Sequence, residues 1–97
     1  MTLEDILNDI YALEDEMRAY ERKYGVLTET FYEAYMQGQE PVDGAWVRDW
    51  AAWASAHKLW LRLREQYQLT IRSQTTHCTI SEIIAQTARH ETISVPA

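Results

Sequence analysis

Two long stretches of the chain place apolar residues at spacings of three and four. The first runs from Ile6 to Tyr24 and the second from Trp46 to Tyr67. Because an α-helix turns once in about 3.6 residues, this spacing gathers the apolar side chains into a seam along one side of a helix. Two seams of similar length predict a long antiparallel helical hairpin, with helices at about 3–24 and 44–69. The seams consist of Ile6, Ile10, Leu13, Met17, Tyr20 and Tyr24, and of Trp46, Trp50, Trp53, Ala56, Trp60, Leu63 and Tyr67.

Further boundary signals predict two short helices. Glycines at positions 25 and 38 enclose an aromatic segment, which predicts an intervening helix over 29–37. Thr79 and Glu82 have the spacing of a capping box, so a second short helix is expected from about Ile80 to His90. The residues at 92–96 alternate in character and predict an extended tail. The expected fold class is all-α, with a hairpin domain over 1–72 and a C-terminal linker, short helix and tail over 73–97.

Charge is distributed unevenly along the 97 residues. The net charge is −6, which disfavours a nucleic-acid partner because phosphate binding requires an excess of Lys and Arg. Residues 1–24 carry a net charge of −4, residues 25–44 also −4, and residues 45–72 a net +3. We expect this basic helix to pair with the chain's own acidic first helix. An alternative is stacking of a nucleic-acid single strand on the basic, tryptophan-rich helix.

The sequence shows no catalytic constellation, so we expect neither an enzyme nor a cofactor. Glu14, Asp15 and Glu16 are consecutive and therefore point around the helix, as on a solvated face. His57 is compatible with a ligand or a proton carrier, but a partly exposed structural histidine is the simpler interpretation. The adjacent His77 and Cys78 are too few for a closed zinc site, and we expect no metal.

The expected location is the cytoplasm. A single cysteine fits a reducing compartment, because it has no partner for an internal disulfide. The acidic N-terminus does not resemble a signal peptide. No apolar run approaches the roughly 20 residues that a membrane-spanning helix needs, so no membrane partner is expected.

The four tryptophans, all between positions 46 and 60, have two interpretations. A helical aromatic stripe usually belongs to the core. Two antiparallel helices, however, form a strip with two faces, and the short helix over 29–37 covers only part of it. The remainder needs a second copy, which would give a four-helix bundle, or a different protein. Tryptophan also often dominates the binding energy of interfaces.

The pattern of spaced residues in the two hairpin helices resembles that of the small helical antitoxin-like proteins of prokaryotic toxin–antitoxin gene pairs. The resemblance covers about residues 3–67. It is carried by Ala12-Leu13-Glu14, Tyr20-Glu21, Lys23-Tyr24-Gly25, Phe31-Tyr32, Tyr35, Gly38, Asp49-Trp50-Ala51-Ala52-Trp53 and Leu61-Arg62. It implies a protein that neutralises a small, ribonuclease-like toxin, encoded by a neighbouring gene, through direct contact.

The sequence therefore predicts a protein-binding module with an antitoxin-like function, in which the tail docks on the partner. The alternative is a homodimeric helical scaffold without a toxin partner. A small enzyme or nucleic-acid binder is a third hypothesis. The expected partner-binding residues are Trp46, Trp50, Trp53, Trp60, Ile83, Ile84, Ile93 and Val95.

Overall fold

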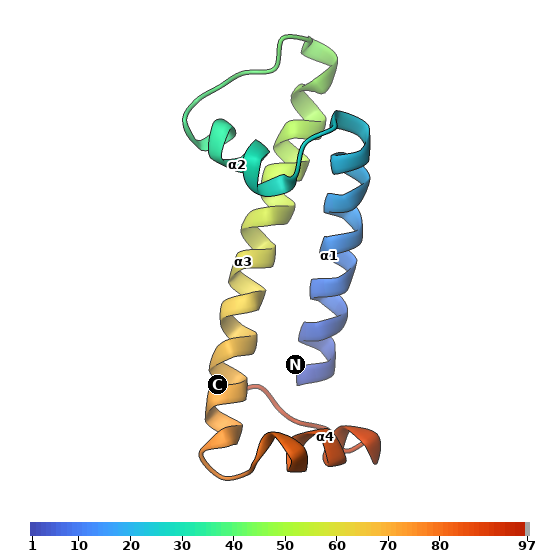
Figure 1. Ribbon diagram of the computed structural model, residues 1–97, viewed down its shortest axis with the longest axis vertical. Coiled ribbons are helices and arrows are strands. Elements are labelled where there is room, and N and C mark those ends of the chain that lie inside the picture. Colours follow the sequence, from blue (N-terminus) through green and yellow to red (C-terminus); the bar gives the residue numbers. More distant parts are fainter. Residues whose placement is uncertain (97) are drawn as a thin grey trace. The chain divides into compact units, whose positions relative to one another are not determined.

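The computed structural model describes residues 1–96 and is all-helical over that range, as the sequence predicts (Figure 1). The two long helices are joined through a short helix and a single 3-10 turn. Residues 1–96 contain no β-strand, only an isolated bridge between Thr2 and Ser94. The elements in chain order are α1 (Leu3–Tyr24), α2 (Thr28–Met36), η1 (Gly44–Trp46), α3 (Val47–Thr75) and α4 (Ile80–Ala88).

The long helix α3 ends at Thr75, further along the chain than predicted. The sequence placed its end at about 69 because the following residues are polar and rich in threonine. In the structure, the Thr70 hydroxyl donates a hydrogen bond of 2.9 Å to the Gln66 carbonyl, one helical turn earlier. The Thr75 hydroxyl likewise donates to the Arg72 carbonyl at 3.1 Å. Threonine hydroxyls that bond to preceding carbonyls are compatible with a helix, so the linker predicted to begin near Arg72 is helical at its start.

Contacts divide the described chain into two compact units. One comprises Tyr11–Leu61, and the other combines Met1–Ile10 with the chain from Arg62 onward. Both α1 and α3 contribute residues to each unit. The residues after position 72 thus pack in the same unit as the start of α1. The domain boundary at position 72 that the sequence suggests is not tested by this division into units, and it stays a prediction.

In the Tyr11–Leu61 unit, α1 and α3 pack antiparallel and α2 contributes an aromatic ring to their core. Trp53 of α3 is fully buried, and its ring stacks on Phe31 of α2 with centroids 3.9 Å apart. Tyr20 and Tyr24 of α1 stack against the same indole at 5.8 Å. We call this group, centred on Trp53, the aromatic cluster. Other members of the core are Leu13, Met17, Tyr32, Tyr35, Trp50, Ala54, Ala56 and Trp60.

A chain of hydrogen bonds fixes the start of α2. Leu27, at its N-cap, provides no side-chain bond to the exposed backbone donors of the first turn. The carboxylate of Glu21 from α1 replaces that cap, accepting bonds from the backbone N–H of Thr28 at 2.9 Å and from its hydroxyl at 2.7 Å. The Trp53 indole N–H in turn donates to the Thr28 hydroxyl at 2.9 Å. These bonds hold α2 on both long helices within this unit.

In the other unit, α4 and the tail cover the first turn of α1. Leu3, Ile83 and Ile93 form a buried cluster, which we call the terminal cluster. The predicted capping box of α4 is present, because Thr79 and Glu82 each bond the other's backbone N–H. The extended tail lies along the N-terminus, where Leu3 N–H donates to the Ile93 carbonyl at 2.8 Å. Partly buried residues around the cluster are Leu7, Tyr67, Ile71 and Cys78.

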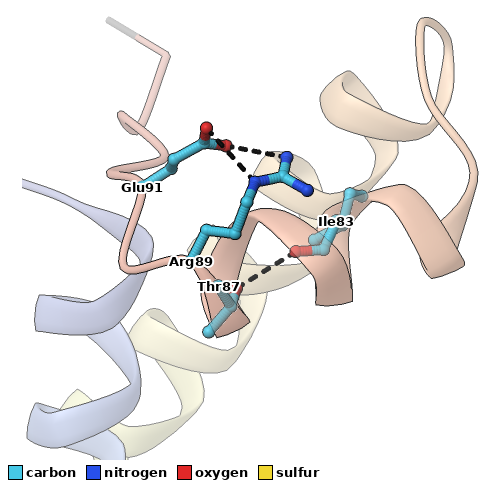
Figure 2. A network of polar contacts seen from close by, with 4 residues as sticks. All are labelled: Ile83, Thr87, Arg89 and Glu91. Carbon is cyan, nitrogen blue, oxygen red and sulfur yellow. Dashed lines mark hydrogen bonds and ion pairs between the residues drawn. The ribbon is translucent and has the colours of Figure 1, made fainter.

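An ion pair between Arg89 and Glu91 lies at the turn between α4 and the tail (Figure 2). Arg89 donates to Glu91 through Nε at 3.4 Å and through Nη2 at 3.2 Å. Within α4, the Thr87 hydroxyl donates a hydrogen bond of 3.1 Å to the carbonyl of Ile83, which lies one helical turn earlier. The intervening His90 has a φ of 60°, a left-handed conformation that reverses the chain. This turn directs Ile93 back onto Leu3.

Candidate functional site

All four predicted interface tryptophans lie in the Tyr11–Leu61 unit, and Trp50, Trp53 and Trp60 belong to its core. Trp53 has no exposed surface, so it contacts no partner in this conformation. Trp46 and Trp50 are half-buried and pack edge-on against Tyr24 and Phe31, at centroid distances of 5.6 and 5.2 Å. The core interpretation therefore holds fully for Trp53, whereas the half-buried Trp46, Trp50 and Trp60 keep exposed edges that are available to a partner.

The predicted residues near the C-terminus are divided between the protein interior and its surface. Ile83 and Ile93 are buried in the terminal cluster. Val95 is half-buried and its N–H donates to the Met1 carbonyl at 3.2 Å. Ile84 is 63% exposed. Of these four, Ile84 is the residue that offers a large apolar surface to a partner.

Helix α4 carries apolar residues on two sides. Ile83 faces the terminal cluster, whereas Ile80 and Ile84 are 52% and 63% exposed. Residues four apart lie on the same side of a helix, one turn from each other. The two exposed isoleucines therefore form a continuous apolar strip, which we call the α4 isoleucine face. In the same unit, Leu69 of α3 is also exposed, at 56%.

A second feature is a cleft of about 220 Å³ in the Tyr11–Leu61 unit, which we call the His57 cleft. Its walls come from α1, from the start of α2 with the preceding residue, and from the middle of α3. They bring carboxylates close to two aromatic rings. The polar and aromatic residues of the wall are Glu14, Arg18, Glu21, Thr28, Glu29, His57 and Trp60.

His57 is buried, with 7% of its surface exposed, which corrects the expectation of a partly exposed histidine. Its ring lies 4.5 Å from Tyr32 and stacks on Trp60 at 5.6 Å. The Nδ1 atom is buried and has no hydrogen-bond partner among the described residues. Burial lowers the pKa of His57 from its ordinary value, and the negative charge of Glu29 acts in the opposite direction. The imidazole is therefore neutral near pH 7.

This burial predicts a pH dependence of stability. Because the folded-state pKa of His57 is depressed, the unfolded chain binds more protons below the ordinary value of 6.5. The contribution is complete above that value and is lost as the pH falls below it. We expect the denaturant midpoint to fall between about pH 7.5 and 5.5 in wild type, and to fall less in His57→Phe. His77→Gln, at an exposed histidine, serves as control. An equal pH dependence in wild type and His57→Phe would contradict the account.

The acidic residues of the cleft were not expected to form a site. Glu14 was assigned to a solvated face, but its side chain is half-buried and its Oε2 accepts a bond of 3.3 Å from the Trp60 indole N–H. One signal was present in the sequence. Glu14 and Glu21 are seven residues apart, so they lie on the same side of α1, next to the seam residue Met17.

In the ion pair between the long helices, the basic residue lies on α1 and the acidic residue on α3, which is the reverse of the predicted arrangement. Lys23 of α1 contacts Asp49 of α3 at 2.6 Å, and the Tyr24 hydroxyl donates to the same Asp49 oxygen at 2.6 Å. Hydrogen bonds from Lys23 and then Tyr24 lower the pKa of Asp49 below its usual range. The acid here comes from α3, whereas the charge balance predicted a basic α3 against an acidic α1.

The described residues thus define an all-α protein with an aromatic core, an exposed isoleucine face and an acidic cleft. Within residues 1–96 there is no group of three or more His, Cys, Asp or Glu side chains placed to hold a metal ion. None of the described helices combines the length and apolar character needed to cross a membrane. Comparison with protein-family models, with curated proteins and with solved structures found no match.

Proposed function

We propose that this chain is an antitoxin-like protein, which binds and neutralises a small basic, ribonuclease-like toxin through direct contact. The observation that carries the proposal is the α4 isoleucine face. Ile80 and Ile84 remain more than half exposed although Ile83, beside them, fixes the helix in place. A helix that is apolar on two sides contacts two neighbours, and the second neighbour here is the partner.

Charge supports a basic partner. The net charge is −6, and the first 44 residues contribute −8 of it before the basic part of α3 offsets a portion. Complementary charge accelerates association and selects among partners more than it raises affinity. The apolar face would then supply most of the binding energy, and the acidic surface would supply the attraction.

The position of the tail changes where the partner binds. The sequence suggested that the tail wraps a partner, but Ile93 is buried against Leu3 within the chain. Truncation near Arg72 would therefore also uncover Leu3, Leu7 and Tyr67, and a loss of binding would not be specific to the interface. Single substitutions on the outer side of α4 separate binding from stability.

We expect Ile84→Glu to weaken toxin binding by about tenfold or more, because it places a charge at the centre of an apolar contact. The side chain is 63% exposed, so the helix content and the denaturant midpoint should stay close to wild type. Binding is measured by calorimetry and helicity by circular dichroism. Val42→Glu is the matched control, since Val42 is 93% exposed and receives the same charge. Equal affinities for both variants would refute a role for the α4 face.

A second candidate function is a homodimeric scaffold, favoured by the exposed leucines of α3. Leu59, Leu61 and Leu69 are 43%, 46% and 56% exposed. A two-fold symmetric contact would cover the same residues on both copies. Light scattering distinguishes the two functions, because the scaffold predicts a stable dimer of the purified chain and the antitoxin predicts a complex with the neighbouring gene's product.

A further inference from the structure

We propose that the C-terminal tail carries an open strand edge, which pairs with an extended, basic segment of the partner protein. The tail meets the N-terminus through an antiparallel bridge between Thr2 and Ser94. On either side of Ser94, the carbonyl of Ile93 and the N–H of Val95 are hydrogen-bonded to the N-terminal segment, at 2.8 and 3.2 Å. One edge of the tail is therefore paired within the chain.

The backbone groups of Ser94 lie on the other edge. In an extended chain the N–H and C=O of one residue point to the same side, and successive residues alternate between the two sides. Because the bonded groups of Ile93 and Val95 face the N-terminal segment, Ser94 presents its donor and its acceptor outward. Within residues 1–96 neither group has a hydrogen bond, and the residue is exposed. Such an unpaired edge is a template for pairing with another chain.

The open edge is short, and its ends are defined. Thr92, two residues before Ser94, is exposed, and within the described residues its backbone has no hydrogen bond either. The same alternation places it on the open edge. Pro96 has no N–H, so Ser94 is the last donor of the edge. An added segment as long as residues 92–96 would cover it.

A pocket of about 290 Å³ lies beside this edge, and we call it the tail pocket. Thr92 and Ile93 of the tail line it, together with Leu3 and Leu7 of α1. When a strand is added to an edge, main-chain bonds supply affinity and pockets for alternate side chains supply specificity. The tail pocket can therefore receive one side chain of the added segment, and its apolar walls suit a long aliphatic stem.

The charged walls of the tail pocket select a basic side chain. Glu4 and Glu91 line it, with His90 and without any Lys or Arg. Glu91 is engaged by Arg89 at 3.2 Å (Figure 2), whereas the Glu4 carboxylate has no hydrogen bond or ion pair within residues 1–96. Lys and Arg bury an aliphatic stem against apolar surface while the charged end stays in a polar environment. A lysine or arginine of the added segment would thus have Glu4 as its counter-ion.

The assignment of this segment to a toxin rests on the proposed function, whereas the binding of an extended basic segment does not. The first experiment titrates the peptide acetyl-Val-Lys-Val-Lys-Val-amide into the full chain and follows the Ser94 amide by NMR. We expect saturable shifts at Ser94 and slower hydrogen exchange of its N–H. The same peptide with Glu in place of Lys should bind about threefold more weakly or less well still. Absence of saturable shifts at Ser94, or equal affinities for the two peptides, overturns the proposal.

Two substitutions at Ser94 test the edge itself. Ser94→Pro removes the outward N–H but neither of the bridge bonds, so affinity for the lysine peptide should fall about tenfold or more. Ser94→Ala keeps the N–H and should bind like the wild type. Exchange protection of the Val95 N–H, which is bonded to the Met1 carbonyl, reports whether the bridge persists. Wild-type affinity in Ser94→Pro overturns pairing at this edge.

Glu4→Gln tests the tail pocket without changing the backbone, and it decides the matter if Ser94→Pro opens the bridge. We expect about threefold weaker binding of the lysine peptide, because the counter-ion is lost. Asp9→Asn is the matched control, since Asp9 is exposed on the same helix but does not line the pocket. Equal affinities of these two variants overturn the proposal.

A further experiment tests the source of the segment, with the product of the adjacent gene as ligand. Ser94→Pro and Glu4→Gln should each lower its affinity while Ser94→Ala does not, and the lysine peptide should compete with it. If the peptide binds but none of these effects appears, the partner's segment is refuted. If the gene product does not bind the wild-type chain at all, the proposed function fails, and this assignment fails with it. Pairing at the tail edge is then decided by the peptide alone.

Discussion

Replacing Trp53 by alanine is expected to destabilise the chain by about 3–5 kcal/mol, the usual cost of removing a large buried aromatic side chain. Trp53 has no exposed surface, stacks on Phe31 at 3.9 Å and bonds to Thr28. Small domains are stable by only about 5–15 kcal/mol, so the loss should lower the urea midpoint strongly. Circular dichroism at increasing urea concentration measures it.

Two variants make this prediction specific. Trp53→Phe keeps an aromatic ring beside Phe31 but removes the indole N–H that bonds Thr28, so an intermediate loss is expected. Trp46→Ala removes a half-buried indole at the end of the cluster and should cost less than Trp53→Ala. A Trp53→Ala protein as stable as Trp46→Ala would show that Trp53 is not the centre of the core.

The second large effect is expected from Ile83→Glu. A carboxylate placed beside Leu3 and Ile93 must either be buried without a partner or force α4 and the tail away from α1. Because detachment is the less costly result, we expect α4 to separate while the Tyr11–Leu61 unit keeps its structure. Hydrogen exchange reports this directly, since the Leu3 N–H is bonded to the Ile93 carbonyl and should lose protection.

The neighbouring isoleucine is the control for this experiment. Ile84→Glu introduces the same charge one residue later, on the exposed side of α4. Protection at Leu3 should be retained in that variant. Equal protection at Leu3 in Ile83→Glu and wild type would contradict the packing of α4 on the terminal cluster.

The helices were predictable because their seams are long. Spacings of three and four over several turns are typical of an amphipathic helix, and the seams of both α1 and α3 have them. The capping box at Thr79 also predicted the start of α4 correctly. The end of α3 was misplaced because Thr70 and Thr75 satisfy their hydroxyls within the helix, which composition does not reveal.

The cleft could not be predicted because it is assembled from three helices. Whether His57 is buried depends on Tyr32 of α2 and Trp60 of α3, and the position of α2 depends on its contact with Glu21 of α1. His57 and Trp60 are three residues apart on one helix, but the contacts that α2 makes with α1 and α3 leave no local pattern in the sequence. Only the spacing of Glu14 and Glu21 hinted that α1 carries carboxylates next to its apolar seam.

What the C-terminal tail packs against was also not predictable from the sequence. Alternation over 92–96 indicated an extended segment, and the bridge between Thr2 and Ser94 is consistent with that. The choice between the chain's own N-terminus and a partner was not visible, since an extended strand pairs with any suitable edge. The structure shows Ile93 in the chain's own terminal cluster, which moves the proposed contact surface to Ile80 and Ile84.

The most direct test of the proposed function is size-exclusion chromatography with light-scattering detection. The purified chain is run alone and then with the product of the adjacent gene. The account predicts a new species with the summed mass of the two proteins, which Val42→Glu also forms and Ile84→Glu does not. Separate elution of wild-type chain and gene product at micromolar concentration, with the chain as a stable dimer, would contradict it.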